Sequence, residues 1–161
     1  FLTLAENFIE GCKKDGVVGI INDRTDIAVL AEADGVHLGQ DEIPPAAARG
    51  LLKRPMLLGG STHSIKELRE AIDAAYDYVG LGPAFASPTK PYLKPAGLDY
   101  IRQAVNLLDT TTIRPVAIGG ITPENLPQVL QTGIKAVAVG AAVLDNPQAR
   151  CREFKKILAQ V

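Results

Sequence analysis

Two loops of small residues near the end of the chain could bind a phosphate group. Gly119 and Gly120 follow the apolar run that begins at Val116, and Gly140 and Ala141 follow the next apolar run. Small residues leave backbone N–H groups accessible, and such groups bind phosphate oxygens. Paired glycines also occur where a turn simply needs them, so that alternative stays open. The placement of both loops after the last two predicted strands favours a phosphate site.

Three carboxylates follow two consecutive apolar runs earlier in the chain. Asp23 follows the run that ends at Ile21, and Asp41 and Glu42 follow the run over residues 35–39. If these runs are neighbouring parallel strands, the carboxylates meet at one rim and can share a Mg²⁺ beside a substrate phosphate. Magnesium usually takes only one or two protein carboxylates, so no histidine cluster is needed. Solvated loop acids or helix caps are the alternative.

A lysine and two histidines are further candidates. Lys90 lies in a Pro-rich loop that runs to Gly97, and such a loop can close over a substrate while its lysine neutralises a pyrophosphate. An ordinary exposed lysine is the alternative. His37 lies inside an apolar run, which is more typical of a core or barrel-lumen histidine than of a base, and His63 fits a simple turn.

The elements that must position these residues alternate along the whole chain. Six runs are apolar at nearly every position, which is typical of parallel strands buried on both faces. The predicted strands are 17–21, 35–39, 56–60, 78–82, 116–120 and 136–140, and the predicted helices are 2–14, 25–33, 45–52, 65–75, 98–108, 123–131 and 147–160. Pro45, Pro123 and Pro147 suit a first helical turn, and Ser64 with Glu67 forms a capping box.

The order of these elements predicts an α/β fold of the (β/α)8 TIM-barrel type. Five of the six predicted strands end in glycine, and polar residues follow those ends, which are the catalytic face of such a barrel. An open doubly wound sheet is the alternative, but no G-x-G-x-x-G opens a helix here. Because a TIM barrel has eight strands and about 250 residues, we expect residues 1–161 to form one barrel domain that lacks its first two βα units. The chain starts at Phe1 inside a helical pattern, which agrees with this expectation.

Composition narrows the possible partners and location. The 161 residues allow one domain with a real core, and 47% hydrophobic with 22% charged residues exclude a disordered or collagen-like chain. A net charge of -1 offers no basic face to a nucleic acid. Without an apolar run long enough for a bilayer or a signal peptide, we expect a cytoplasmic protein with no membrane partner. Cys12 and Cys151 are expected to be reduced helix residues, although a single disulfide stays open.

Six motifs occur in a characteristic order and spacing. They are Ile21-Asn22-Asp23-Arg24, Gly35-Val36-His37-Leu38-Gly39-Gln40, Gly60-Ser61-Thr62-His63, Tyr78-Val79-Gly80-Leu81-Gly82-Pro83, Pro88-Thr89-Lys90 and Ala117-Ile118-Gly119-Gly120-Ile121. Together they resemble the thiamine phosphate synthase family over nearly the whole chain. That family is a (β/α) barrel that joins hydroxymethylpyrimidine pyrophosphate to a thiazole phosphate with Mg²⁺, giving thiamine phosphate and pyrophosphate. The resemblance implies a transferase with these two small-molecule substrates, and a homo-oligomer is possible.

The resemblance assigns one group of residues to the pyrimidine pyrophosphate and its metal. Asn22 resembles the family's pyrimidine ligand, and Asp23 resembles one magnesium ligand. Glu42 stands where the family usually has its second metal-binding aspartate, so Glu42 or its neighbour Asp41 would complete the site. Ser61 matches the serine near the pyrophosphate. The family's Gln-x-Arg-x-Lys strand, which grips the pyrophosphate, does not precede Val17, and a truncated sequence is the simpler explanation.

A second group of residues matches the site of the leaving group and of the thiazole phosphate. Lys90 matches the lysine that supports the departing pyrophosphate, which makes Lys90 and Ser61 the catalytic candidates. The segment Ser87, Pro88 and Thr89 matches the loop that holds the thiazole phosphate, with serine in place of the usual threonine. Gly120 matches the glycine whose N–H faces this phosphate. At Gly140 and Ala141 the family often has a branched aliphatic residue and serine, so here only backbone donors remain.

Two other functions stay open beside the transferase. The related thiazole tautomerase is an isomerase of similar fold that often lacks the full metal and pyrophosphate set, and Asn22-Asp23 with Pro88-Thr89-Lys90 argue against it here. A non-catalytic phosphate-binding barrel is suggested by the missing N-terminal units and by the changes at Glu42 and at Gly140 and Ala141. Coupling of the two substrates would indicate the transferase, and tautomerisation without coupling would indicate the isomerase. Binding of thiazole phosphate without turnover would indicate the non-catalytic barrel.

Overall fold

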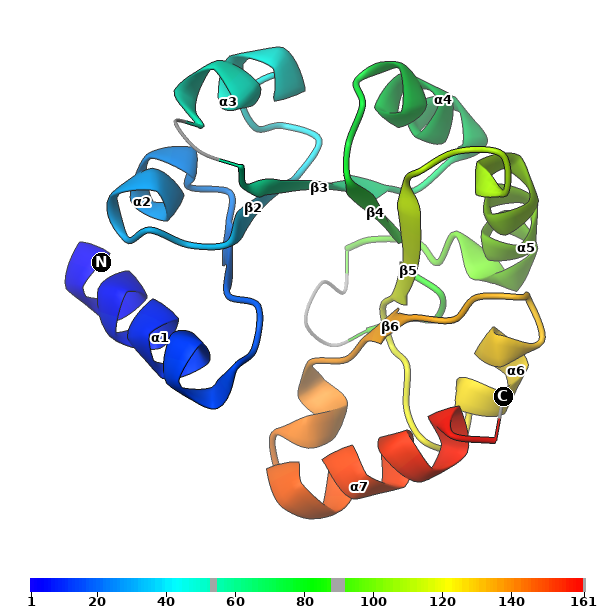
Figure 1. The fold of residues 1–161 in the computed structure, drawn as a ribbon. Coiled ribbons are helices and arrows are strands. Elements are labelled where there is room, and N and C mark those ends of the chain that lie inside the picture. Colours follow the sequence, from blue (N-terminus) through cyan, green and yellow to red (C-terminus); the bar gives the residue numbers. More distant parts are fainter. Residues whose placement is uncertain (53–54, 88–91, 161) are drawn as a thin grey trace.

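Strands and helices alternate throughout the computed structural model, which describes residues 1–52, 55–87 and 92–160 (Figure 1). The strands are β1 (Ile20–Asn22), β2 (Gly35–Leu38), β3 (Leu57–Thr62), β4 (Tyr78–Leu81), β5 (Arg114–Ile118) and β6 (Val137–Ala138). The helices are α1 (Leu2–Asp15), α2 (Thr25–Leu30), α3 (Pro45–Leu51), α4 (Ile65–Asp73), α5 (Gly97–Leu108), α6 (Leu126–Leu130) and α7 (Pro147–Leu158), with a 3-10 helix η1 (Ala141–Val143) before α7.

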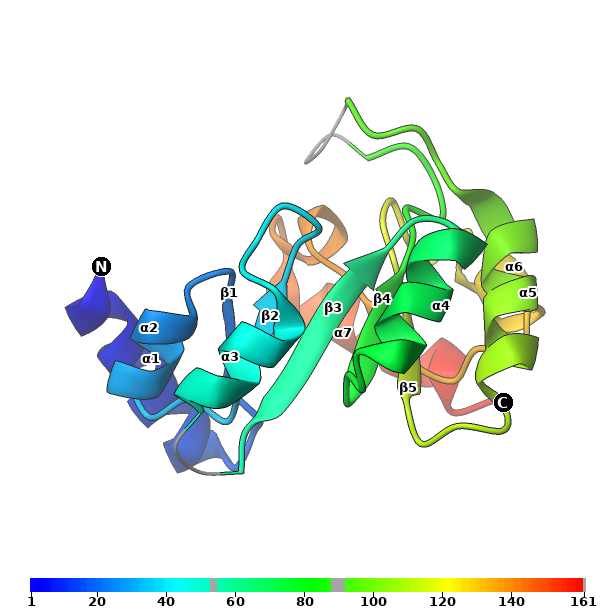
Figure 2. The same ribbon diagram turned by 90° about the horizontal axis from the view of Figure 1, so that it is seen from above.

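The sheet is singly wound and curled. All its neighbouring strands are parallel, and their order in space, β1-β2-β3-β4-β5-β6, is their order in the sequence. A doubly wound sheet would reverse its strand order at a switch point, so that alternative is wrong for the described strands. The helices surround the outside of the curl (Figure 1), and α3 and α4 lie across β2 to β4 in Figure 2. The chain therefore forms a parallel half-barrel.

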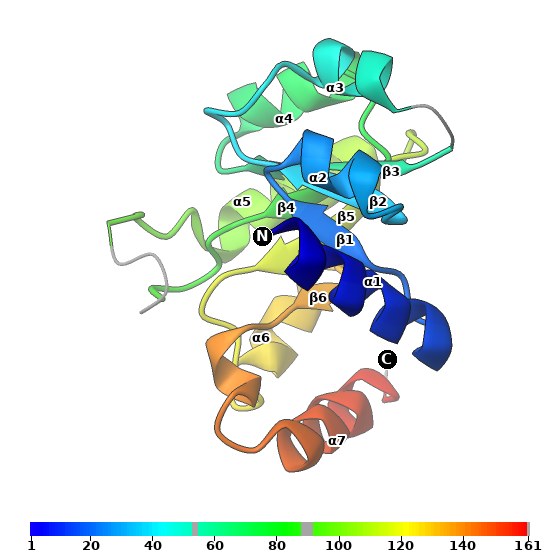
Figure 3. The same cartoon turned by 90° about the vertical axis from the view of Figure 1, so that its left-hand side faces the viewer.

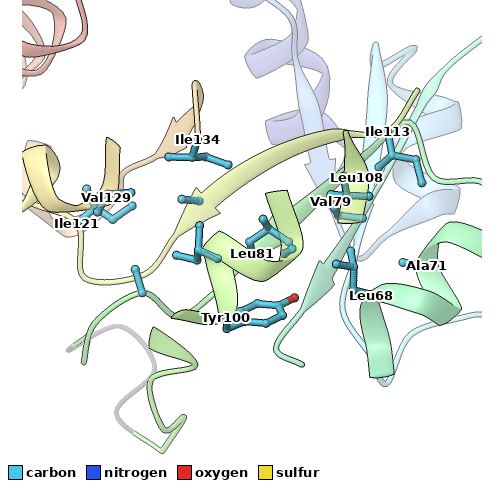
Figure 4. Packing of buried hydrophobic residues seen from close by; sticks show 14 of the residues in the cluster. Leu68, Ala71, Val79, Leu81, Tyr100, Leu108, Ile113, Ile121, Val129 and Ile134 are labelled. Carbon is cyan, nitrogen blue, oxygen red and sulfur yellow. The ribbon is translucent and has the colours of Figure 1, made fainter. Parts of the chain in front are cut away.

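Two clusters of buried side chains fill the space between the sheet and its helices. The larger cluster joins β4 and β5 to α4 and α5, and Figure 4 shows Leu81 and Tyr100 at its centre. The smaller one joins α1, α2 and α3 to the start of the sheet through residues such as Ile9 and Val36. Each fully buried Leu or Ile stabilises the fold by about 1.5–3 kcal/mol. These clusters hold the strand ends in fixed positions relative to one another.

Burial differs between the middle and the ends of the sheet. Strands β2, β3 and β4 are buried at most positions, as predicted for two covered faces, but β1, β5 and β6 are not, so the prediction is wrong for these three. Strands β1 and β6 are the sheet edges, which Figure 3 shows with α1 in front of β1. Val17 and Val18 lie before β1 and are 56% and 63% exposed. Neither of them has the second layer of side chains that full burial needs.

The predicted helix starts are correct to within one residue except for α6, whereas α2, α4 and α7 end two or three residues earlier than predicted. Pro45 and Pro147 occupy the first turn of α3 and α7, as expected. Pro123 does not begin a helix, because the side chain of Asn125 accepts a hydrogen bond from the N–H of Thr122 at 2.8 Å and holds a turn there. The helix begins only at Leu126. The same Asn125 side chain also donates a hydrogen bond to the loop that precedes this turn.

The two cysteines lie on described helices, and the length and hydropathy of those helices bear on the membrane. Cys12 is buried on α1 and Cys151 is exposed on α7, and both thiols are free. In the described part of the chain, we find no helix whose length and apolar character would allow it to cross a membrane.

The N-terminus of α4 is capped by the predicted box and fixes a histidine beside it. Ser64 accepts from the N–H of Glu67 at 3.2 Å. The Glu67 carboxylate accepts from the N–H of His63 at 2.8 Å and lies 2.9 Å from His63 Nδ1. Burial alone would raise the pKa of Glu67, but the hydrogen bonds from His63 and Ser64 outweigh it, so the pKa is lowered. The charged carboxylate therefore stabilises the folded chain.

Glu67→Gln is expected to lower the free energy of unfolding by about 1 kcal/mol at neutral pH, the usual contribution of a helix cap. Because the folded-state pKa of Glu67 is depressed, its contribution is present above the unfolded-state pKa and is lost as the pH falls through the folded one. Thermal unfolding of both proteins at pH 7 and near pH 3 measures this, and the two should converge at the lower pH. Glu70→Gln on the same helix, where Glu70 only meets Lys66 at 3.8 Å on the surface, is the control with little effect.

Candidate active site

A cavity of about 460 Å³ opens at the carboxyl ends of β3 to β6. It collects most of the residues predicted for the phosphate of one substrate, although they lie far apart in the sequence. The predicted phosphate residues in its lining are Ser87, Gly120, Gly140 and Ala141, and Ser61, which was predicted near the pyrophosphate, also lines it. The rest of the lining is mostly apolar, with Leu93, Ile118 and Ile121 among its larger side chains. A cavity of this size and character suits an organic ring that carries a charged group at one end.

The loop after β5 needs both of its glycines. Gly119 and Gly120 have φ angles of 97° and 63°, which favour glycine. A Cβ on Gly120 would lie 2.5 Å from the carbonyl oxygen of Ala86, and one on Gly119 would lie 2.6 Å from Pro83 Cα. Asn125 donates to the carbonyl oxygen of Gly120 at 2.9 Å and so secures the turn. The glycines therefore satisfy a turn and, because they line the cavity, also leave their backbone accessible to a ligand.

The loop after β6 is built differently. Gly140 has a φ of -121°, and a Cβ there would meet nothing within 4 Å. Ala141 opens the helix η1, whose Val143 N–H donates to the carbonyl oxygen of Gly140 at 3.0 Å. Both Gly140 and Ala141 are exposed. Packing against neighbouring atoms therefore does not require a glycine at this position.

Side-chain atoms of two predicted metal ligands, Asp23 and Glu42, lie close to Gly39. From the position of a Cβ on Gly39, the Oδ1 atom of Asp23 is 3.8 Å away and the Cγ atom of Glu42 is 3.7 Å away. No described atom of Asp41 comes within 4 Å of that point. Asp23 itself has a φ of 64°, a conformation that aspartate tolerates better than most residues. Of the two neighbouring acids, Glu42 is thus the one whose side chain approaches Gly39 together with Asp23.

The donor set at this rim fits a magnesium ion. Carboxylate oxygens are the ligands that Mg²⁺ prefers, and one or two of them with water suffice. Among the described residues, no group of three or more His, Cys, Asp or Glu side chains converges, so a transition-metal site has no basis there. Asp23 and Glu42 would hold Mg²⁺.

A partly buried chain of hydrogen bonds joins side chains of β2, β3 and β4 beside the cavity. His37 Nε2 lies 2.9 Å from Ser61 Oγ, and His37 Nδ1 lies 3.0 Å from the hydroxyl of Tyr78. Asn22 is paired in register with His37, so both face the same side of the sheet. Ser61 follows Gly59 by two residues on β3, so it lies on that same side of the sheet, and it lines the cavity.

Sequence reasoning gave no role to Tyr78, although it lies within one of the quoted motifs. Its ring passes over β3, where a Cβ on Gly59 would lie 2.0 Å from Tyr78 Cζ. The strand register pairs His37 with Gly59 and Gly59 with Tyr78. Gly59 lies between His37 and Tyr78 in this register, and a glycine in that position leaves room for the two polar side chains to meet.

Three predicted site residues lie outside the described residues. They are Pro88, Thr89 and Lys90, and their roles stay predictions from the sequence. Asn22, the predicted pyrimidine ligand, is exposed at the end of β1. Its carbonyl oxygen accepts from the N–H of Arg24 at 2.7 Å, which closes the turn that carries Asp23.

Comparison with known proteins agrees with this geometry. A family profile described as thiamine monophosphate synthase (TMP-TENI) matches residues 1–143. The chain belongs to the thiamine monophosphate synthase family. The thiamine-phosphate synthase of Acidothermus cellulolyticus is 41% identical over 162 residues, which cover 98% of this chain and 75% of that relative.

Other relatives of the thiamine monophosphate synthase family are considerably longer. The thiamine-phosphate synthase of Synechococcus sp. WH7803 is 40% identical to this chain over 96% of its length, and that of Thermosynechococcus vestitus is 42% identical over 99%. The chain spans only 43% and 45% of their lengths. A solved structure of thiamine phosphate pyrophosphorylase from Pyrococcus furiosus superposes with a TM-score of 0.88 and 28% identity, covering 99% of this chain and 76% of that one.

Proposed function

We propose that this chain carries the active site of a Mg²⁺-dependent thiamine phosphate synthase. Its substrates would be hydroxymethylpyrimidine pyrophosphate and thiazole phosphate, and its products thiamine phosphate and pyrophosphate. The observation that carries the proposal is the placement of two sets of groups at one end of the sheet. Ser61 and the glycine loops line the cavity, and the side chains of Asp23 and Glu42 approach Gly39, which follows β2 at the same end of the sheet.

In this proposal the cavity holds the thiazole phosphate. Ser87 offers a hydroxyl, and the backbone N–H groups at Gly120, Gly140 and Ala141 are the other donors for the phosphate oxygens. The apolar lining around Ile118 would take the ring. The phosphate fixes the orientation of the ring, so that its nitrogen points towards the second substrate.

The pyrimidine pyrophosphate would bind on the side of β1 and β2. Asn22 faces the sheet side that also carries His37, and an amide there can bind the polar edge of a pyrimidine. Asp23 and Glu42 would hold Mg²⁺, which stabilises the charge of the pyrophosphate when it is bound. Ser61 and, from the sequence, Lys90 would contact the same group.

The proposed reaction is a dissociative substitution. The bond between the methylene carbon and the pyrophosphate oxygen breaks, and pyrophosphate leaves with the electron pair. The lone pair of the thiazole nitrogen then forms the new carbon–nitrogen bond, so no strong base is required. The protein must supply donors and charges that stabilise the leaving anion, and Ser61 with Lys90 supplies them from the chain itself.

We also propose that residues 1–161 belong to a single (β/α)8 barrel domain in the cytoplasm. The singly wound order of the strands supports the barrel, because each further βα unit would extend the same curl. The high structural similarity to the archaeal enzyme, over 76% of its length, also supports it. The cytoplasmic location rests on the sequence prediction.

The deciding experiment is a coupling assay on the full-length gene product. Both substrates are mixed with Mg²⁺, and thiamine phosphate and pyrophosphate are followed, with a matched reaction in EDTA. Product that depends on the metal would support the transferase. Tautomerisation of the thiazole without coupling, or binding of thiazole phosphate without turnover by a folded protein, would instead overturn the proposal.

A further inference from the structure

The chain of hydrogen bonds from Tyr78 through His37 to Ser61 has a definite geometry. It crosses three strands, and both ring nitrogens of His37 take part, at 3.0 Å from Tyr78 and 2.9 Å from Ser61. The rings of His37 and Tyr78 are 5.5 Å apart between centroids and tilted by 33°. Gln40 adds a bond from its side chain to the carbonyl oxygen of Ser61, which holds the backbone of the same residue. Ser61 is therefore fixed at both its backbone and its side chain.

The direction of this chain follows from its outer end. A neutral imidazole donates from one nitrogen and accepts at the other. Burial raises the pKa of Tyr78 to about 12, so its phenol stays protonated and has a hydrogen to donate. Among the described residues, His37 Nδ1 is the acceptor within its reach. If Nδ1 carried the hydrogen instead, the phenol would have no acceptor among the described residues of the protein. Tyr78 thus donates to Nδ1, and His37 donates from Nε2 to Ser61.

This direction decides what Ser61 can offer a ligand. A hydroxyl has one hydrogen and two lone pairs, so a Ser61 that accepts from His37 still has its hydrogen to donate. Ser61 lines the cavity on β3, next to β2 and the side proposed for the pyrophosphate, where that hydrogen can meet a pyrophosphate oxygen, which only accepts. We propose that Tyr78 and His37 are positioning residues that hold the Ser61 hydroxyl as a hydrogen-bond donor towards the leaving pyrophosphate. The role of the pyrophosphate rests on the proposed function, whereas the direction of the chain does not.

The packing around His37 indicates that this arrangement is set before any ligand binds. Gly59 cannot take a side chain without moving the Tyr78 ring, since its Cβ would lie 2.4 Å from the Tyr78 hydroxyl oxygen. A Cβ on Gly80 would meet His37 Cε1 only at 3.6 Å, an ordinary contact. The glycine between Tyr78 and His37 is therefore required by the hydrogen bond itself, and such preorganised donors are effective in catalysis.

Nitrogen NMR of the histidine side chains, in the full-length protein labelled with ¹⁵N-histidine, tests the direction of these hydrogen bonds. The protein has two histidines, and a His63→Gln variant assigns their signals. We expect His37 to show a protonated Nε2 and an unprotonated Nδ1, and Tyr78→Phe to mix the two tautomers. A protonated Nδ1, either alone or in an imidazolium, would overturn the proposal.

Substitutions of His37 test its role in turnover. The side-chain amide of Gln reaches the level of Nε2 and can still donate to Ser61, whereas that of Asn reaches only the level of Nδ1. We expect His37→Asn to lower kcat by about 10- to 100-fold, as for other groups that orient a ligand-binding residue. The KM for thiazole phosphate should stay the same, and His37→Gln should restore most of kcat. Equal losses in both variants would indicate a merely structural role.

Two comparisons separate this proposal from simple destabilisation and from the proposed function. His37→Asn added to Ser61→Ala should cause no further loss of kcat, since both act through one hydroxyl. Tyr100→Phe is the matched control for Tyr78→Phe: it removes a buried phenol that donates to Thr62 at 2.7 Å, and it should lower only the thermal stability. If the protein couples no substrates, the proposed function fails, yet the NMR signals still decide the direction of the chain.

Discussion

Replacing Gly120 with alanine is expected to destabilise the protein by about 3 kcal/mol and to weaken its binding of phosphate. Alanine at a φ of 63° carries left-handed strain, and its Cβ would lie 2.5 Å from the carbonyl oxygen of Ala86 and 2.9 Å from Phe85 Cβ. The segment 84–86 would have to move, and Ser87 with it. Thermal unfolding should show a midpoint lower by roughly 10 °C. Titration with thiazole phosphate measures the loss of affinity.

Gly133→Ala separates the strain of the backbone from the collision at the cavity. Gly133 has a φ of 90°, and the nearest atom to its Cβ is Val105 Cγ1 at 3.5 Å. This variant carries comparable strain without a clash, and Gly133 does not line the cavity. We expect it to cost about 1 kcal/mol and to leave phosphate affinity unchanged. If Gly120→Ala bound thiazole phosphate as tightly as the parent, the loop after β5 would not be its site.

The sequence alone was sufficient to predict the order of the elements and the face of the sheet that carries the polar residues. Continuous apolar runs, glycines at their ends and prolines at helix starts are local patterns, and each predicts a strand, a strand end or a helix start without knowledge of the fold. The exposure of Val17 and the short β6 were not predictable in this way. Whether an apolar residue is covered depends on the layer that lies against it, and this is a property of the fold and not of the run.

The site was predictable wherever a residue acts through its own position in a loop. Asp23 and Gly120 each follow a strand end, and the structure places them there. The Tyr78–His37–Ser61 chain was not predicted, because it depends on the register of three strands and on the missing side chain of Gly59. The choice of Glu42 over Asp41 needed the loop geometry beside Gly39. Contacts between side chains of different strands depend on the strand register, which the spacing of residues along one sequence does not reveal.

Asp23→Asn is expected to lower the coupling rate by on the order of 100-fold or more, because a Mg²⁺ ligand contributes several kcal/mol to the stabilisation of a leaving phosphate. Asparagine tolerates the positive φ of this position as well as aspartate does, so the backbone should stay in place and only the charge is lost. The rate is measured against Mg²⁺ concentration, and half-saturation should shift to higher concentrations. Calorimetric titration with Mg²⁺ and pyrophosphate gives the same comparison without turnover.

Asp26→Asn is the matched control for the loss of a carboxylate in this region. Asp26 lies on α2, where its pKa is lowered to about 2, chiefly by the hydrogen bond from Arg24, and its carboxylate forms an exposed ion pair with Arg24. Removing its charge should leave the coupling rate and the Mg²⁺ dependence unchanged. Glu42→Gln should resemble Asp23→Asn, and the double variant should lose less than the two separate losses would predict, since both carboxylates would hold one ion. Independent, fully additive losses would place Asp23 and Glu42 in separate roles and would refute a shared magnesium site beside Gly39.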